Sequence, residues 1–449
     1  MNTPIVDFVK DYAERKSVRF HMPGHKGVPI LGPEPFDITE IDGADVLYSP
    51  NGIIVRSEDN ATELFGSYHT FYSTEGSSLA IKAMLGVAVS NVKGRRPLIL
   101  AARNAHKAFM YACALLDIDV CWLYGEKNDN LCACNINKND VETALEDLKT
   151  LPDAVYITSP DYMGNRLDIS AIAKACHSRN IPLLVDNAHG AYLAFTEPGC
   201  HPLQLGADAC CDSAHKTLPV LTGGAYLHVS KNAPESFKDK GLIRNTLAIF
   251  ASTSPSYLIM QSLDMANKYI KEGYKDSLEQ HIAQIDDLKS VLTQHGYVIR
   301  NTEPLKIVIV ANEYGYSGNE LAKILRNNNI ECEFADSDNV VLMSTPQNSS
   351  EDIDRLACVL IALPKKSPIP STEEQMPSLC SVAKLSIREA VFSKRETVSI
   401  DSACGHICAS PVVSCPPAIP IVVSGEIITE DHIFVLKAYG ISKIEVCAE

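Results

Sequence analysis

The feature that most constrains the fold is an alternation of short apolar runs with amphipathic segments between about residues 60 and 230. Segments with helical spacing, such as Asp140–Lys149 and Ile169–Arg179, separate several of these runs. The apolar runs are PLILAA (97–102), VCWLY (120–124), AVYIT (154–158), IPLLVD (181–186), ADACCD (207–212) and GAYLHV (224–229). Strands that alternate with helices form a mostly parallel sheet with helices on both faces. The sequence therefore predicts an α/β fold.

The rest of the chain divides into segments of different character. Its 449 residues exceed what one compact core usually holds. Residues 306–361 repeat the α/β theme on a smaller scale, with strands over KIVIV, IECEF and NVVLM and helices over GNELAKILRNN and EDIDRLACVLIAL. The stretch KKSPIPSTEEQMPS (365–378) has the composition of a linker. We predict an N-terminal arm and linker at 1–60, a large domain at 61–270, a small α/β domain at 271–364 and a C-terminal domain at 365–449.

Composition excludes several classes of partner. The net charge of −15 disfavours a nucleic-acid-binding surface, which needs basic patches. The 15 cysteines include no pair with the two-residue spacing of a zinc or redox motif, so free thiols and no metal are expected. The N-terminus lacks the apolar core of a signal peptide, and no apolar run approaches the ~20 residues that span a bilayer. These features predict a cytoplasmic protein without a membrane partner.

Polar and charged side chains follow two neighbouring apolar runs. Asp186 closes IPLLVD, and His189 comes three residues later. His215 and Lys216 follow ADACCD within the segment SAHKTLPVLTGG. A single strand-end aspartate is usually a turn residue, and a single lysine usually lies on the surface. Ligands, however, collect at the carboxyl ends of strands in an open parallel sheet. The joint placement of these four residues therefore predicts a site.

A second group of residues suits a phosphate. In FYSTEGSSLAIKAML, which we interpret as a loop entering a helix, Gly76 precedes Ser77 and Ser78. The first N–H groups of a helix lack partners and bind phosphate, although an ordinary serine N-cap is about equally compatible with this pattern. His106 follows the strand PLILAA, at the carboxyl end of another strand. A lysine, a strand-end aspartate, a histidine that can stack and a phosphate cradle are the parts that hold pyridoxal 5'-phosphate.

The motifs around these residues resemble the ornithine/lysine/arginine decarboxylase family of bacterial pyridoxal-phosphate enzymes. The resemblance covers nearly the whole chain, and the segment around Lys216 is its most specific part. It implies fold type I, the aspartate-aminotransferase-like fold, with a seven-stranded sheet in the large domain. The motifs are RFHMPGHKG (19–27), DITEIDGADVLY (37–48), LFGSYHTFYSTEGSS (64–78), RNAHK (103–107), TSPDYMG (158–164), DNAHGAYLAF (186–195), GADACCDSAHKTLPVLTGGAYLH (206–228), STSPSYLIMQSLD (252–264) and, more loosely, CPPAIPIVVSGEIIT (415–429).

The resemblance also implies roles for individual residues. Lys216 would form the Schiff base with the cofactor, Asp186 would pair with the pyridine nitrogen, and His215 would be a candidate for proton transfer. The other implied cofactor contacts are His106 stacked on the ring, His189 near the ring, Ser77, Ser78 and Ser213 on the phosphate, and Thr253 and Ser254 in STSPSY. The last two often act across a dimer interface in such enzymes, which implies a homodimer with shared active sites.

Two features bear on the branch of the family. The chain starts almost directly at the HMPGHKG region, so it resembles the short form without an extra N-terminal domain. The C-terminal motif CPPAIP…SGE departs from the usual YPPGIP…PGE, with Cys415 for tyrosine, Ala418 for glycine and Ser424 for proline. Because glycine and proline set special backbone conformations, their loss is expected to alter a turn.

The activity that the resemblance implies is decarboxylation of arginine, lysine or ornithine to the amine and CO2, feeding polyamine metabolism. The distal cation of such a substrate needs an acidic partner. The segment IECEFADSD offers Glu331, Glu333, Asp336 and Asp338, and the family has a glutamate near Glu333. A solvated loop accounts for at least two of the four, and we select Glu333 and Asp336 as candidates. The alternatives are another fold type I reaction (aldolase, desulfurase or aminotransferase) and a regulatory protein that binds the cofactor without turnover.

Overall fold

The computed structural model describes residues 1–125, 131–372, 377, 379–380, 382–413 and 418–448. The chain forms two compact units. Unit 1 comprises Met1–Asn91, Asp153–Val155 and Ile169–Ser277, and unit 2 comprises Val92–Pro152, Tyr156–Asp168 and Leu278–Glu449. The division into four domains stays a prediction. Among the described residues, no helix has both the length and the apolar character needed to cross a membrane.

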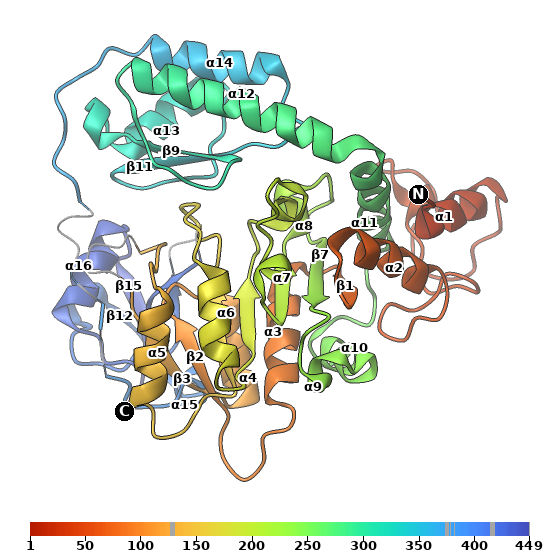
Figure 1. Ribbon diagram of the computed structural model, residues 1–449, viewed down its shortest axis with the longest axis horizontal. Helices are drawn as coiled ribbons and strands as arrows, with labels where there is room; N and C mark the ends of the chain where they lie inside the picture. The colour runs from red at the N-terminus through yellow and green to blue at the C-terminus, as the bar shows by residue number, and fades with distance from the viewer. Residues whose placement is uncertain (126–130, 373–376, 378, 381, 414–417, 449) are drawn as a thin grey trace. The chain divides into compact units, whose positions relative to one another are not determined.

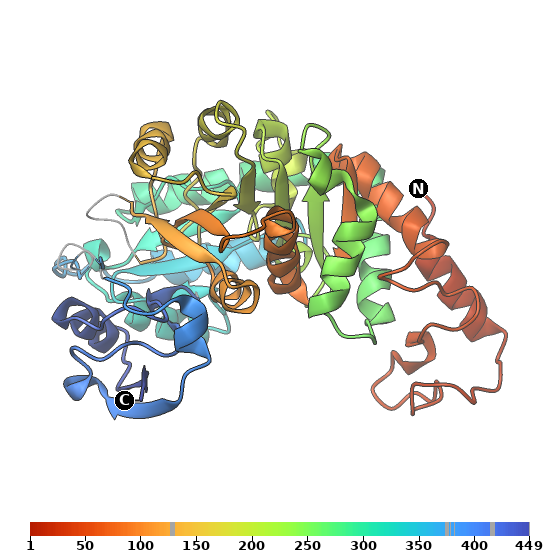
Figure 2. The same cartoon turned by 90° about the horizontal axis from the view of Figure 1, so that it is seen from below.

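The main sheet has seven strands in the order β1-β7-β6-β5-β4-β2-β3. Strands β5 and β6 are parallel, as are β2 and β3, whereas β7 is antiparallel to both β6 and β1. Figure 2 shows helices on both faces of the sheet. The strands are β1 His69–Ser73, β2 Leu98–Ala102, β3 Asp119–Leu123, β4 Ala154–Thr158, β5 Leu183–Asp186, β6 Ala209–Asp212 and β7 Ala225–Val229. The predicted α/β class with a mostly parallel sheet is confirmed.

Strand β1 corrects the sequence analysis, which placed a loop over FYSTEGSS. Phe71 and the two residues after it belong to β1, and all five residues of this strand are buried. Its polar side chains hid it from a search for apolar runs. Two of them have polar neighbours inside the protein, because Thr70 Oγ1 forms a hydrogen bond with His228 Nδ1 at 2.8 Å and His69 Nε2 lies 3.5 Å from the buried Glu58 carboxylate.

The strand registers in unit 1 bring several chain segments to one edge of the sheet. Ser73, which ends β1, pairs with Ala225 at the start of β7. Asp212, which ends β6, pairs with Tyr226 of β7. Asp186, which ends β5, pairs with Cys211 of β6. The segments after β1, β5 and β6 and the segment before β7 therefore meet at this edge, where an open α/β sheet binds ligands.

The helices of unit 1 pack around this sheet and on one another. Helix α3 packs against β6 and β7, α6 packs against β5, and α1 packs against α2 and α11. The helices are α1 Pro4–Glu14, α2 Ile53–Phe65, α3 Gly76–Val89, α6 Ile169–His177, α7 Pro202–Leu205, α8 Ala214–Thr217, α9 Glu235–Lys238, α10 Lys240–Phe250 and α11 Tyr257–Tyr269.

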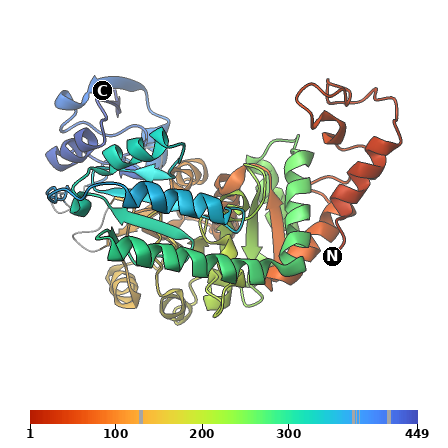
Figure 3. The same cartoon turned by 90° about the horizontal axis from the view of Figure 1, so that it is seen from above.

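Unit 2 contains a four-stranded antiparallel sheet in the order β10-β11-β9-β8. Helices α12 and α14 lie side by side on this sheet and contribute leucines to one apolar core (Figures 1 and 3). The strands are β8 Val298–Ile299, β9 Lys306–Val310, β10 Phe334–Ala335 and β11 Asn339–Met343, and the helices are α12 Lys275–Gln294, α13 Gly318–Asn327 and α14 Ser350–Ile361. The predicted strand over IECEF is wrong in extent, because β10 begins at Phe334, the buried residue that follows the exposed Glu333.

The remaining elements of unit 2 include the segment that follows the predicted linker. They are α4 Lys107–Leu116, α5 Lys138–Asp147, α15 Ile387–Val391, α16 Glu430–Ala438, β12 Arg395–Ser399, β13 Val412–Val413, β14 Pro420–Val422 and β15 Lys443–Cys447. Strand β12 pairs with β15, and β13 pairs with β14. Ala418 precedes β14 with a left-handed φ of 59°, and its carbonyl oxygen accepts the Lys107 N–H at 3.0 Å. Cys415 lies outside the described residues.

Candidate active site

Lys216 lies at the edge of the main sheet where the strand ends meet. It is half-buried on α8, the helical turn that follows β6, and its Nζ lies 2.9 Å from His189 Nε2. His189 comes from the segment after β5. Chain segments 27 residues apart thus present an amine and an imidazole to each other. Both residues were predicted to lie at one edge of the sheet, and the structure brings them into contact.

Asp186 occupies the carboxyl end of β5 and is 2% exposed. Its Oδ1 accepts the Ala188 N–H at 3.2 Å and the Cys211 thiol at 3.5 Å. These contacts hold the carboxylate to its own turn and to the neighbouring strand. The buried carboxylate is therefore oriented by the fold at the same edge as Lys216.

Ser77 and Ser213 form the core of the expected phosphate cradle. Helix α3 begins at Gly76, and among the described residues no side chain caps it. The Ser213 hydroxyl donates to Ser77 Oγ at 2.9 Å, so the two serines converge from β6 and α3. Ser78 lies in the first turn of the same helix. An ordinary serine N-cap is not what the structure has, because the N-cap residue is Glu75.

The glycine pair before β7 closes the other side of this edge. Gly223 has a φ of 98°, and its carbonyl oxygen accepts the Gly76 N–H at 2.8 Å. A Cβ on Gly223 would lie 2.9 Å from the Thr74 carbonyl oxygen, so only glycine fits there without strain. His215 is held against the same pair, since its Nδ1–H donates to the Gly224 carbonyl oxygen at 3.0 Å.

The residues of unit 1 fit a phosphorylated aldehyde cofactor such as pyridoxal phosphate. An amine, a buried carboxylate, two converging hydroxyls and an uncapped helix start share one edge of the sheet. Next to Lys216, the buried Thr217 hydroxyl has no hydrogen-bond partner among the residues that the structure describes. A polar ligand at this edge could satisfy it. Thr253 and Ser254 are exposed in the loop before α11, and this loop touches the start of α3 because the Ser252 N–H donates to Glu75 Oε1 at 2.7 Å.

His106 and the acidic candidates belong to unit 2. His106 is the N-cap of α4, and its Nδ1 accepts the Ala108 N–H at 3.1 Å. Glu333 is exposed and accepts a hydrogen bond from the Tyr162 hydroxyl. Asp336 is buried, and its Oδ1 accepts the N–H groups of Asp338 and the next residue at 2.8 and 2.7 Å. The structure gives Asp336 a turn-closing role, and its part in substrate binding stays a prediction.

The other two acidic residues of this segment have local partners. Glu331 pairs with Arg326 at 3.3 Å on the surface. Asp338 is buried and accepts the Ser371 hydroxyl at 2.7 Å and the Thr372 N–H at 2.8 Å. Glu331 thus agrees with the expectation of a solvated loop, whereas the buried Asp338 does not and has a structural role instead.

The buried charged groups that the sequence did not reveal include two that centre on Lys306 and Asp212. Lys306, at the start of β9, is fully buried; its Nζ donates to the Asp161 carbonyl oxygen at 3.1 Å and lies 3.7 Å from Glu303 Oε1. Burial lowers the pKa of Lys306 and raises the pKa of Asp161 to about 6. The sequence does contain a sign of this buried lysine, because Lys306 is the first residue of the apolar run KIVIV. The second group centres on Asp212, the residue directly before Ser213.

Comparisons with known proteins agree with this geometry. The model of the family described as "Orn/Lys/Arg decarboxylase, major domain" matches residues 3–310, and that of "Orn/Lys/Arg decarboxylase, C-terminal domain" matches residues 371–439. An arginine decarboxylase of Bacillus subtilis is 32% identical, over 96% of this chain and 92% of its own. An arginine decarboxylase of Bacillus anthracis is 30% identical, over 96% and 92%. The solved lysine decarboxylase LdcF of Francisella novicida superposes with a TM-score of 0.79 at 16% identity, over 99% of this chain and 81% of its own, which confirms the fold.

Proposed function

Because the chain belongs to the Orn/Lys/Arg decarboxylase family and is thus an amino-acid decarboxylase, we propose that it uses pyridoxal phosphate to decarboxylate a basic amino acid, with arginine as the first candidate. The contact that carries the proposal is the 2.9 Å approach of Lys216 Nζ to His189 Nε2, at the sheet edge where Asp186 and the Ser77–Ser213 pair also lie. Arginine is preferred because both curated relatives described above are named arginine decarboxylases. The amine produced would enter polyamine metabolism.

The residues of this edge would share the work of binding and proton transfer. Pyridoxal phosphate, when bound, supplies an electron sink for the electron pair that remains after the carboxylate leaves as CO2. Lys216 would bond covalently to its aldehyde, and His189 Nε2 can accept the proton that the Lys216 ammonium must lose first. Asp186 would accept the ring N–H, and Ser77 and Ser213 would donate to the phosphate.

His215 is the proposed proton donor to the α-carbon, together with Lys216. Its Nδ1–H donates to the Gly224 carbonyl oxygen, which fixes the ring orientation and makes Nε2 the atom that would exchange a proton. Glu333 is the proposed partner of the distal guanidinium or ammonium, and its bond from Tyr162 limits the directions in which its carboxylate can point. His106 is the proposed stacking partner of the ring.

A homodimer with shared active sites is part of the proposal. The segment 18–31 in unit 1 carries large apolar side chains that are almost fully exposed, among them Phe20 at 96%, Leu31 at 89% and Val18 at 81%. A group of such residues in one segment is typical of a surface that is covered by a partner. A second copy of the chain is the partner that we propose, and Thr253 and Ser254 would contribute to the neighbouring site.

The test compares the protein with two lysine variants after incubation with pyridoxal phosphate. We expect a visible absorption band from the covalently bound cofactor, its loss in Lys216→Ala, and its retention in Lys231→Ala, a control on an exposed lysine after β7. CO2 release is then measured in parallel with arginine, lysine and ornithine. A protein that stays colourless contradicts cofactor binding. A coloured protein that yields an aldol or amino-transfer product, or no product, would replace the decarboxylase proposal with one of the alternatives.

A further inference from the structure

Asp212 is a fully buried carboxylate that receives three side-chain hydrogen bonds. Its Oδ1 accepts Asn187 Nδ2–H at 2.7 Å, and its Oδ2 accepts His201 Nε2–H at 3.0 Å and His228 Nε2–H at 3.1 Å. All four residues are 0% exposed. Burial opposes ionisation, but the two imidazoles outweigh it and hold the pKa of Asp212 below its usual value. The carboxylate therefore stays ionised in the interior.

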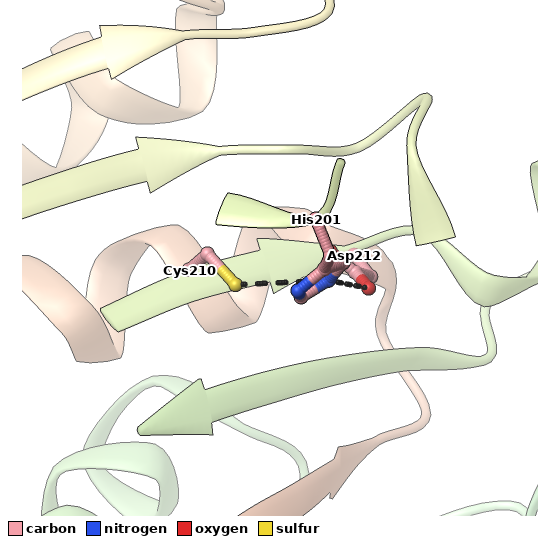
Figure 4. A group of neighbouring side chains, drawn as sticks. All are labelled: His201, Cys210 and Asp212. Carbon is pink, nitrogen blue, oxygen red and sulfur yellow. Dashed lines mark hydrogen bonds and ion pairs between the residues drawn. The ribbon is translucent and has the colours of Figure 1, made fainter. Parts of the chain in front are cut away.

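The residues around Asp212 also include a possible metal-ligand set, which Figure 4 shows. The ligand atoms of His201, Cys210 and Asp212 lie within 4.8 Å of one another. Their chemistry disfavours a metal. His201 Nδ1 accepts the Leu203 N–H at 3.4 Å, so the neutral ring carries its proton on Nε2, directed at Asp212. Burial and the Asp212 charge raise the pKa of the Cys210 thiol, and a thiol is a poor ligand. We therefore interpret the group as a hydrogen-bonded network.

The network joins the two strand ends that carry the candidate active site. Asn187 directly follows Asp186 on β5, and Asp212 directly precedes Ser213 on β6. The Asn187–Asp212 hydrogen bond is thus a side-chain tie between the two positions from which Asp186 and Lys216 are presented. The histidines hold the other carboxylate oxygen, which prevents Asp212 from rotating away from Asn187.

We propose that Asn187 and Asp212 are positioning residues, whose hydrogen bond sets the spacing between Asp186 and the Ser213–Lys216 segment. This inference rests on the proposed function, because the spacing matters only if one ligand bonds to both strand ends. The two side chains are an amide and a carboxylate of the same shape. Exchanging them leaves one donor facing one acceptor, keeps an acceptor for both histidines and keeps the total charge. The hydrogen bond between positions 187 and 212 is therefore predicted to form whichever of the two positions carries the amide and whichever carries the carboxylate.

The experiment measures the dissociation constant of pyridoxal phosphate and the visible circular dichroism of the bound cofactor, with the thermal unfolding of the apoprotein alongside. Asn187→Asp places two carboxylates against each other, and we expect the dissociation constant to rise roughly tenfold or more, as for loss of one charge-assisted hydrogen bond. The exchange Asn187→Asp with Asp212→Asn is expected to bring it back within roughly threefold of the original value. The dichroism signal should fall in Asn187→Asp and recover in the exchange variant.

Asp208→Asn is the matched control. Asp208 is also buried, and it joins β5 to β6 by accepting the Leu183 N–H at 2.7 Å, but it lies at the amino end of β6, about 13 Å from Asp212 along the strand. We expect this variant to lower the unfolding temperature and to leave cofactor affinity unchanged. Should Asn187→Asp fail to fold, Asn187→Ala breaks the tie without adding charge.

Three outcomes would overturn the inference. They are an exchange variant that binds no better than Asn187→Asp, an Asn187→Ala variant that binds as the original chain does, and an Asp208→Asn variant that loses affinity to the same extent. Failure of the proposed function is distinguishable, because the unaltered chain would then bind no cofactor through Lys216.

Discussion

The buried carboxylate of Asp264 holds the amino-terminal helix α1, and its raised pKa predicts how strongly the stability of this contact depends on pH. Asp264 on α11 is fully buried, and its Oδ2 accepts the N–H groups of Ile5 and Val6 at 2.9 and 3.0 Å. Its Oδ1 accepts the Ser57 hydroxyl at 2.6 Å. Burial raises the pKa of Asp264 from 3.8 to about 6 despite these hydrogen bonds, and the charge of Asp7 adds to the rise.

The sign of the pH dependence follows from that raised pKa. The folded state binds the Asp264 proton more tightly than the unfolded state does, so this group contributes stability that is fully present below about pH 3.8. The contribution is lost as the pH rises through about 6. A difference of about two pKa units corresponds to about 3 kcal/mol. Since α1 is docked through this carboxylate, the loss should appear as easier local opening of α1.

Asp264→Asn removes the titration and keeps the shape of the side chain. Hydrogen exchange of the Ile5 and Val6 amides measures local opening, and comparing both proteins at each pH cancels the intrinsic pH dependence of exchange. Between about pH 4 and pH 7, we expect the protection of the variant relative to the original chain to rise by roughly a hundredfold. Asp11→Asn, on the exposed face of α1, is the control and should show no such trend. A ratio that stays constant, or that falls with pH, refutes the reasoning.

Three further predictions concern stability, and each is checked by the midpoint of thermal unfolding. Ala418→Gly should stabilise the chain by about 1 kcal/mol, because an alanine at a φ of 59° carries strain that glycine lacks; an unchanged or lower midpoint contradicts this. Glu58→Gln should destabilise by about 3 kcal/mol, because it leaves the Arg244 guanidinium, whose side chain is only 11% exposed, without its charge partner; an unfolding midpoint unchanged within error would contradict it. Gly425→Ala should destabilise by about 2 kcal/mol or more, since its φ is 93° and the new Cβ would lie 2.2 Å from the Leu385 carbonyl oxygen; a neutral effect would count against the described turn.

Most of the main sheet could be predicted because six of its seven strands consist largely of apolar residues. The six apolar runs correspond to β2–β7, and five of these strands are almost entirely buried, as expected for strands covered on both faces. The sixth, β3, lies at the end of the sheet and is only half-buried at four of its five residues. β1 could not be found in this way. Its sequence HTFYS is half polar, and it is buried only because the partners of His69 and Thr70 come from α2 and β7. A pattern search sees the polar residues but not the partners that satisfy them.

In the candidate active site, too, some features could be predicted from the sequence and others depend on tertiary packing. Asp186, His189 and Lys216 follow strand ends in the sequence, and the parallel arrangement of β5 and β6 is enough to bring them to one edge. The Asp212 network depends instead on His201 and His228, which reach the carboxylate from α7 and β7. These contacts depend on how α7 and β7 pack against β6, and no fixed spacing between the residues in the sequence predicts them.

The C-terminal motif shows that the type of a residue predicts the free-energy cost of a backbone conformation better than it predicts which conformation the chain adopts. The loss of glycine at position 418 suggested an altered turn, yet Ala418 takes the left-handed conformation that glycine favours. Two contacts of the surrounding chain hold the segment: the Ala418 carbonyl oxygen accepts the Lys107 N–H at 3.0 Å, and the Val423 N–H donates to the buried Glu426 carboxylate at 2.8 Å. Left-handed alanine costs about 1 kcal/mol, which is less than the cost of breaking such buried hydrogen bonds. Position 418 therefore has a backbone conformation that glycine favours, and the substitution is expected to be expressed as lost stability.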